Sequence, residues 1–267
     1  MKKLLSVMLF VYPILFLSAP SICQKSREIN KSFRFKRDGR VDINTYKGSI
    51  TIRTWDRSEV KVFVKIEVEN WDRYSEKKVK YTEIDFDHSP NHLRIKSDYD
   101  KIKKGSSSFW GLFSKNTGSL PLVHYEIQMP RNANLVIEDY KSETEISGLH
   151  ASVELETYKG KVDIRGLEGS MELETYKGEV EVDYKEMTGR NRFETYKGNI
   201  KISLPEDTNF DLDLDLGRRG EFDSDFDINM GRRGRKNRGK YYRGSINRGG
   251  VKLIVETDKG EIRLYAK

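Results

Sequence analysis

Glutamate, tyrosine and lysine recur together in this sequence in a form that could do chemistry. The pentapeptide Glu-Thr-Tyr-Lys-Gly stands at 156–160, 174–178 and 194–198. Repeated carboxylates could bind a divalent cation or a basic ligand, and two carboxylates facing each other across a cleft suit glycoside hydrolysis. An active site is made once, however, whereas these carboxylates are repeated identically. The repeat therefore indicates a surface, and the competing interpretation of the acidic rows is a solvated face balanced by the neighbouring lysines.

The tyrosines and lysines of the same motif are candidate contact residues. A column of exposed rings could contact sugars or another protein, although stacked rings also simply stabilise successive turns. The column would include Tyr140 and could continue to Tyr46. The candidate surface-binding residues in the motif itself are Tyr158, Lys159, Tyr176, Lys177, Tyr196 and Lys197.

A second candidate surface is the basic stretch 231–248, which the sequence predicts to be a loop. Arginine and lysine interleaved with tyrosine attract polyanions. In an exported protein these would be lipopolysaccharide, acidic glycans or anionic lipid heads, and no nucleic acid is expected. The alternative is a long charged loop without a ligand. The candidate residues are Arg232, Arg233, Arg235, Lys236 and Arg238.

The remaining metal-ligand types do not form a recognisable site. The alternating aspartates of 211–215 mimic a calcium loop, but Leu216 stands where that loop needs glycine and Phe222 where it needs glutamate. His88 and His92 lack a third ligand nearby in the sequence. No nucleophile elbow or phosphate-binding loop is present. The sequence therefore predicts no catalytic residue, no metal site and no cofactor.

The elements that must position the motif follow a template centred on its tyrosine. Around Tyr158, the apolar residues Val153 and Leu155 stand five and three positions before the ring, and Val162 and Ile164 stand four and six positions after it. Apolar residues two apart predict strands with one buried face. Glycine after lysine fits a tight turn that needs positive φ.

Six sites obey this template, centred on residues 46, 140, 158, 176, 196 and 258. Only Asn191 among the twelve preceding positions, and Thr144 among the twelve following ones, is not apolar. Constant spacing and identical turns predict an all-β fold, a single-chain β-solenoid of stacked coils of about 18–20 residues, in which coils lie about 4.8 Å apart. The alternative is a meander of antiparallel hairpins in a sandwich. The only short helix expected is 75–81.

Composition and the N-terminus define the class of protein. The chain has 267 residues, of which 34% are charged and 36% apolar, so its core must be narrow. Its single cysteine, Cys23, excludes an internal disulfide framework. A basic start and an apolar run of about 16 residues, shorter than the roughly 20 that span a bilayer, predict a signal peptide over 1–23. Lipidation of Cys23 is the alternative, which the bulky Ile22 before it disfavours.

The sequence therefore predicts a signal peptide at 1–23 and a β-strand-repeat domain at 24–267. Within that domain it predicts an exposed insertion at 101–120 and the basic loop at 231–248. No transmembrane helix is expected in the mature chain. The expected location is the periplasm, the outer-membrane surface or the extracellular space.

The stretches VDINTYKGSITIRTW, YEIQMPRNANLVIEDYKSETEISG, IKISLPEDTNFDLDLDLG and GSINRGGVKLIVETDKGEIRLY flank the repeated units. Together they resemble the bacterial envelope family of adhesin type with β-strand repeats, a domain of unknown function. The resemblance covers roughly 34–267 and implies a β-solenoid without established catalytic residues, associated with the cell surface, envelope stress and adhesion. Tyr-Lys stands here in a turn where that family usually has small residues.

Taken together, these features predict a non-enzymatic, exported β-solenoid of the cell envelope that acts as an adhesin-like scaffold or binding surface. The alternatives are a polysaccharide-active β-helix enzyme and a polyanion binder that uses the basic loop. Expected partners are envelope glycans, lipopolysaccharide or another surface protein. An enzyme should show one cleft with unmatched acidic and basic residues, whereas a scaffold should show the same exposed rows on coil after coil.

Overall fold

The computed structural model describes residues 26–104, 119–234 and 240–267. The signal peptide expected at 1–23, including Cys23, lies outside the described residues, as does most of the insertion expected at 101–120. The first residues of that insertion form a short helix, and Ile102 within it is buried. The expectation that the whole stretch is exposed is therefore wrong at this end, because an apolar side chain there packs into the core.

The described chain is built almost entirely from strands. Its two helices are α1 Ser75–Tyr81, over the range that the sequence predicts, and α2 Asp100–Lys104. In chain order, the strands are β1 Ser26–Arg34, β2 Arg40–Asn44, β3 Lys47–Trp55, β4 Glu59–Glu67, β5 Glu83–Ser89, β6 His92–Asp98, β7 Leu122–Pro130, β8 Asn134–Asp139, β9 Lys141–Ser147, β10 Val153–Gly169, β11 Met171–Met187, β12 Arg190–Leu204, β13 Phe210–Ser224, β14 Asn229–Gly234, β15 Lys240–Ile246 and β16 Val251–Ala266.

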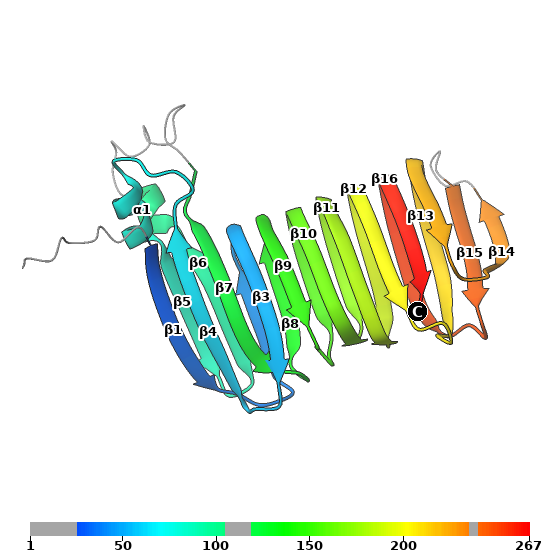
Figure 1. Ribbon diagram of the computed structural model, residues 1–267, viewed down its shortest axis with the longest axis horizontal. Coiled ribbons are helices and arrows are strands. Elements are labelled where there is room, and N and C mark those ends of the chain that lie inside the picture. The colour runs from blue at the N-terminus through cyan, green and yellow to red at the C-terminus, as the bar shows by residue number, and fades with distance from the viewer. Residues whose placement is uncertain (1–25, 105–118, 235–239) are drawn as a thin grey trace, which may run out of the picture.

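The strands form one sheet that bends at each Tyr-Lys-Gly, so every coil contributes a segment before the bend and a segment after it. Figure 1 shows the coils standing side by side along the long axis, with α1 at one end and β14 and β15 at the other. Neighbouring coils pair in parallel and in exact repeat register: Glu156 lies opposite Glu174, and Thr157 opposite Thr175. This pairing confirms the β-solenoid and rules out the sandwich of antiparallel hairpins for the repeated coils.

The core is a narrow apolar layer between the two segments of each coil. All template positions around the six bends are buried, including the two polar exceptions, Asn191 and Thr144. Large side chains such as Phe193 and Tyr184 fill the layer in successive coils. Because each coil buries its apolar face only against its neighbours, the core is continuous along the stack.

The two ends of the stack are closed by antiparallel strands. At one end, β1 pairs with β4 and β4 with β7, while β5 and β6 form an antiparallel hairpin. At the other end, β13 is followed in space by β15 and then β14. A closing hairpin pairs the outer edge of the last coil, whose backbone groups would otherwise have no partner in the sheet.

This closing hairpin corrects the expectation of a basic loop at 231–248. Most of that stretch is strand, because β15 pairs along β13 from Phe210 opposite Ile246 to Leu216 opposite Lys240. Ile246 is buried against the core, which anchors the hairpin. The C-terminal strand β16 lies between β12 and β13, so the chain returns to insert its last coil inside the stack.

The glycine of each bend is required mainly by close packing between coils. A Cβ at Gly178 would overlap the carbonyl oxygen of Gly160, well inside the 3.0 Å that real Cβ atoms keep, and the same conflict with a neighbouring carbonyl oxygen recurs at Gly48, Gly160, Gly198 and Gly260. Positive φ, the reason that the sequence suggests, applies at Gly48, Gly198 and Gly260, where φ is 143°, 154° and 128°. The approach of neighbouring backbones is the shared cause.

Candidate binding edge

The bends of successive coils bring five tyrosines into one stacked ladder. Neighbouring ring centroids lie 4.7–4.9 Å apart, and the ring planes are within 10° of parallel. This spacing follows from the strand spacing of about 4.8 Å, which happens to match the separation of stacked rings. The ladder runs in the order Tyr46, Tyr140, Tyr158, Tyr176 and Tyr196.

The stacking limits what the ladder can contact. Each tyrosine is 39–46% exposed, but within the ladder the faces of each ring are covered by its neighbours. The ladder therefore presents ring edges and phenolic hydroxyls to solvent, and a sugar cannot stack on a ring face along its length. At one end the ring of Tyr99 stands edge-on to Tyr46, with centroids 6.3 Å apart.

A column of basic residues runs beside the tyrosines, one position further along each coil. Most of these side chains are exposed, whereas Lys47 is buried and its ammonium lies 2.6 Å from Glu69. In β13 the column is continued by Arg219, which lies opposite Lys259. The lysines are Lys47, Lys141, Lys159, Lys177, Lys197 and Lys259. The tyrosine ladder and this lysine column together are named the Tyr–Lys edge.

An acidic row lies on the other side of the tyrosines, two positions before Tyr140, Tyr158, Tyr176 and Tyr196 and at the matching positions of β16 and β13. Among the described residues, no ion pair joins this row to Lys159, Lys177 or Lys197, so the balance expected from the sequence is not made by direct contact. Instead Arg192 lies 2.8 Å from Glu194 and 3.2 Å from Glu256. The row consists of Glu138, Glu156, Glu174, Glu194, Glu256 and Asp215.

A metal site does not emerge from this row. In the described part of the chain, no three or more histidine, cysteine, aspartate or glutamate side chains are grouped so that they could hold a metal ion. His92 Nε2 donates a hydrogen bond to Asp42 Oδ2 at 2.8 Å, and His88 Nε2 donates one to the carbonyl oxygen of Arg34 at 2.8 Å. The two histidines singled out in the sequence therefore have ordinary structural partners.

A column of threonines lies inside the bend, one position before each tyrosine, and Asp139 takes the place of one of them. Its carboxylate accepts hydrogen bonds from the backbone and hydroxyl of Ser142, at 2.7 and 2.6 Å, and from Thr157 Oγ1 at 2.9 Å. Burial nevertheless raises the pKa of Asp139 above its usual range, against the lowering effect of these hydrogen bonds.

This raised pKa predicts a pH dependence that an Asp139→Thr variant should lose. The carboxyl of Asp139 binds its proton more tightly in the folded state than in the unfolded chain. Its contribution to the free energy of unfolding therefore falls as pH rises from about 4 through its raised pKa. The free energy of unfolding of the wild type should therefore fall relative to that of the variant over this range. Urea denaturation of both proteins from pH 4 to pH 7 measures the difference, and a constant difference would contradict the prediction.

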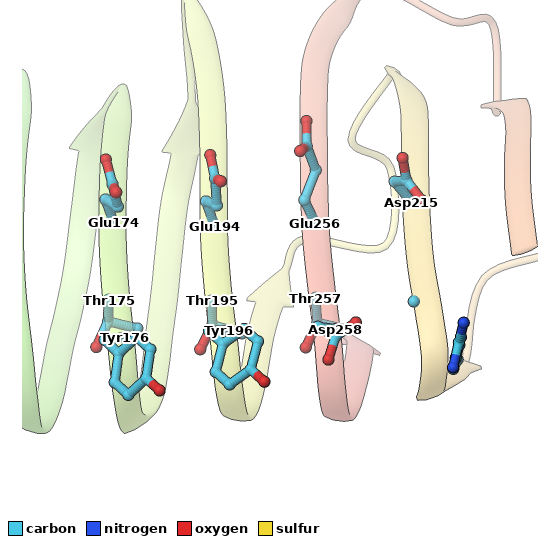
Figure 2. Close-up of a pocket in the computed structure, with 12 residues that line it drawn as sticks. Glu174, Thr175, Tyr176, Glu194, Thr195, Tyr196, Asp215, Glu256, Thr257 and Asp258 are labelled. Carbon is cyan, nitrogen blue, oxygen red and sulfur yellow. The ribbon is translucent and has the colours of Figure 1, made fainter. Parts of the chain in front are cut away.

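The tyrosine ladder ends at an open groove of 390 Å³, named here the end groove. The next coil, β16, carries Asp258 where the other coils carry tyrosine, and β13 approaches from the far side with Gly217 and Arg218. Figure 2 shows Asp258 beside Tyr176 and Tyr196 at the same level, with the row of glutamates above them. The ammonium of Lys259 lies 5.0 Å from the centroid of the Tyr196 ring.

The sequence template did not identify one further bend, which lies in β13. Gly217–Gly220 occupies the place of Tyr-Lys-Gly in β13, with Arg219 opposite Lys259 and Gly220 opposite Gly260. An extra residue at this bend, seen as a register shift between Leu216 and Arg219, displaces it from the common spacing. The alternation of Leu212, Leu214 and Leu216 before it, all buried, was the signal that could have revealed the seventh coil.

The side chains of Arg232, Arg233, Arg235, Lys236 and Arg238 lie outside what the structure describes; the backbone of 229–234 is strand β14. In the neighbouring strand, Arg243 lies 2.8 Å from Asp213.

Comparisons with known proteins agree with the coil architecture. The family model described as Toastrack DUF4097 matches residues 127–265. No curated protein matches the chain. None of the helices in the described ranges is both long and apolar enough to span a bilayer.

Solved structures that resemble the chain are distant. A protein of Clostridium sporogenes whose name refers to cell adhesion is 14% identical, with a TM-score of 0.41, over 91% of this chain and 100% of its own. A protein of Parabacteroides distasonis whose name refers to lipid binding is 11% identical, with a TM-score of 0.27, over 88% and 96%. A Bacteroides fragilis protein named for adhesin function is 12% identical, with a TM-score of 0.23, over 89% and 97%. These likenesses are too distant to bear on function.

Proposed function

The chain belongs to the Toastrack DUF4097 family, and on this premise we propose that it is a non-enzymatic, adhesin-like binding scaffold of the cell envelope. Its contact surface is the Tyr–Lys edge. The signal peptide predicted at 1–23 would export it, and its partners would be envelope glycans, lipopolysaccharide or another surface protein.

The observation that carries this proposal is the repetition of the same exposed rows on coil after coil. Glu174, Tyr176 and Lys177 have counterparts at identical positions in the neighbouring coils, in register through the backbone pairing. A catalytic site needs different groups placed around one reacting bond. A surface of identical rows instead supplies many equivalent weak contacts, whose effects multiply when a ligand or partner repeats in the same way.

The chemistry of the edge defines what it would hold. The ring edges of tyrosine carry the positive rim of the aromatic quadrupole, the phenols donate hydrogen bonds, and the lysines add positive charge. The acidic row lies close by on the other side of the rings. The edge therefore suits an extended ligand that has anionic or hydrogen-bond-accepting groups along one side and donors along the other.

A paired substitution tests the role of the edge. In a Tyr140→Ser/Tyr158→Ser variant, retention on bacterial envelope fragments in a sedimentation assay should fall about tenfold, because two adjacent aromatic contacts are lost. The matched control is Glu145→Ser/Lys161→Ser, which changes two exposed residues of the same coils in the other segment and leaves the net charge unchanged. Circular dichroism should show both variants folded.

Two results would contradict the proposal. Equal retention of the tyrosine variant and its control would remove the edge as the contact surface. Release of new reducing ends from envelope polysaccharide by the wild type would favour the enzyme alternative.

A further inference from the structure

We propose that the end groove is a binding site for a single pyranose sugar ring, which stacks on the outer face of Tyr196. This inference rests on the proposed function, because it names a ligand class for one end of the same surface.

The first argument is the ring face itself. Between Tyr46 and Tyr196 each ring face is covered by another ring at 4.7–4.9 Å, and the outer side of Tyr46 meets the edge of Tyr99. Beyond Tyr196 the ladder position is held by Asp258, whose short side chain cannot continue the stack. Figure 2 shows Asp258 at this place, beside the Tyr196 ring. A flat ring of the ligand can occupy it as the next step of the ladder.

The second argument is the interaction already present at this face. The ammonium of Lys259 lies 5.0 Å from the Tyr196 centroid and 3.3 Å from its hydroxyl. Its side chain is 36% exposed and its nearest carboxylate, Asp258, is 3.9 Å away, so the ammonium is weakly held. A ligand can displace it into water, and a cationic group of the ligand would take over the same attraction to the ring.

The third argument is the polar rim. Glu194, Glu256 and Asp258 line the groove with carboxylates that accept hydrogen bonds from hydroxyl or amino groups, and Arg218 supplies donors from β13. An apolar platform surrounded by several acceptors fits a ring whose faces carry C–H bonds and whose periphery carries donors.

The size and charge of the end groove restrict the class of ligand further. A volume of 390 Å³ lies near the lower end of the roughly 300–1,000 Å³ of small-molecule sites. Carboxylates outnumber guanidinium groups on the rim, so a sugar with an amino group or neutral hydroxyls is favoured and a uronate is disfavoured. An amino sugar gains both the ring stacking and the cation–π interaction.

The experiment measures binding of D-glucosamine and D-glucuronate to the full mature chain by saturation-transfer NMR and calorimetry. D-Glucosamine should bind, and Tyr196→Ala should weaken it about tenfold, the loss expected for one aromatic stacking contact. Tyr81→Ala is the control, because it removes an equally exposed tyrosine (40%) on α1. It should leave binding unchanged.

A second variant keeps the test independent of folding defects. Asp258→Tyr should add a sixth ring to the ladder and fill the groove, so D-glucosamine binding should be lost while the thermal melt remains unchanged or rises. Binding of D-glucosamine to Asp258→Tyr at wild-type strength, equal binding of D-glucuronate, or no binding of D-glucosamine to the wild type would each overturn the proposal.

The two proposals fail separately. Envelope retention that persists in Tyr196→Ala, together with lost sugar binding, would leave both intact. Retention unaffected by Tyr140→Ser/Tyr158→Ser, with sugar binding present, would remove the Tyr–Lys edge and keep the end groove.

Discussion

Substituting Gly178 by alanine is expected to lower the free energy of unfolding by about 3 kcal/mol or more, the upper range for overpacking a well-packed interior. The added Cβ would overlap the carbonyl oxygen of Gly160. That oxygen belongs to the backbone of the neighbouring coil, β10, so it cannot move aside as the end of a flexible side chain can. Relief requires the two coils to separate at the bend, which breaks their parallel hydrogen bonds.

The control for this prediction is Lys177→Ala, one residue earlier in the same bend. Its side chain is exposed, so the change should alter stability by less than about 0.5 kcal/mol. Urea denaturation followed by circular dichroism measures both variants. A Gly178→Ala midpoint equal to that of Lys177→Ala would show that the coils are more loosely stacked than the structure describes.

The repeated coils could be predicted from the sequence because the residues that determine each coil lie close together in the chain. Each bend carries its own apolar positions and its own glycine, and identical coils can pair only in identical register. One bend departs from this rule. Ser142 stands in place of glycine near the start of β9, directly after the bend that separates β8 from β9. Its backbone and hydroxyl are held by Asp139, an interaction that the Asp139 position in the sequence does not reveal.

The order of the coils at the C-terminal end could not be predicted in this way. Because every coil offers the same pairing edges, β12 could accept either β13 or β16 as its neighbour. The choice is made by contacts distant in sequence, among them the backbone hydrogen bonds from Lys267 to Leu204 and from Glu206 to Lys267, at 3.0 and 3.1 Å. The hairpin of β14 and β15 then follows from the need to cover β13.

Part of the candidate surface could likewise be predicted from the sequence, and part could not. The column of tyrosines could be expected from the repeat, but its stacking could not, because that depends on the coil spacing matching the separation of stacked rings. Because the rings stack, their faces are covered by neighbouring rings. The ladder ends at Tyr196, because the next coil carries Asp258 at this position. The end groove depends on Asp258 and on the displaced bend of β13, and neither follows the repeat.

Asn191 stands at a position where the other coils carry apolar residues, and the structure gives its reason. Its side chain is fully buried. Its Oδ1 accepts hydrogen bonds from the backbone of Met171 at 2.9 Å and from the hydroxyl of Tyr184 at 2.8 Å, and its Nδ2 donates to the carbonyl oxygen of Thr188 at 3.0 Å. One amide therefore satisfies two buried groups of β11 and the carbonyl oxygen of the turn that leads from β11 to β12.

An Asn191→Val variant restores the apolar template and is nevertheless expected to be less stable by about 3 kcal/mol. The valine leaves the Tyr184 hydroxyl and the Met171 amide buried without partners, at about 1–3 kcal/mol for each group. This cost exceeds what an additional buried methyl group contributes. The free energy of unfolding from urea denaturation gives the result directly.

Two further variants identify the cause. Tyr184→Phe should cost only about 1 kcal/mol, because Asn191 keeps its other two hydrogen bonds. In Asn191→Val/Tyr184→Phe, the second substitution should restore part of the loss, because the unpaired hydroxyl is removed together with its former acceptor. An Asn191→Val protein as stable as the wild type would mean that the apolar template alone governs this position. A double variant as unstable as the sum of the single ones would place the cost on the Met171 amide, because removing the hydroxyl would then have relieved nothing.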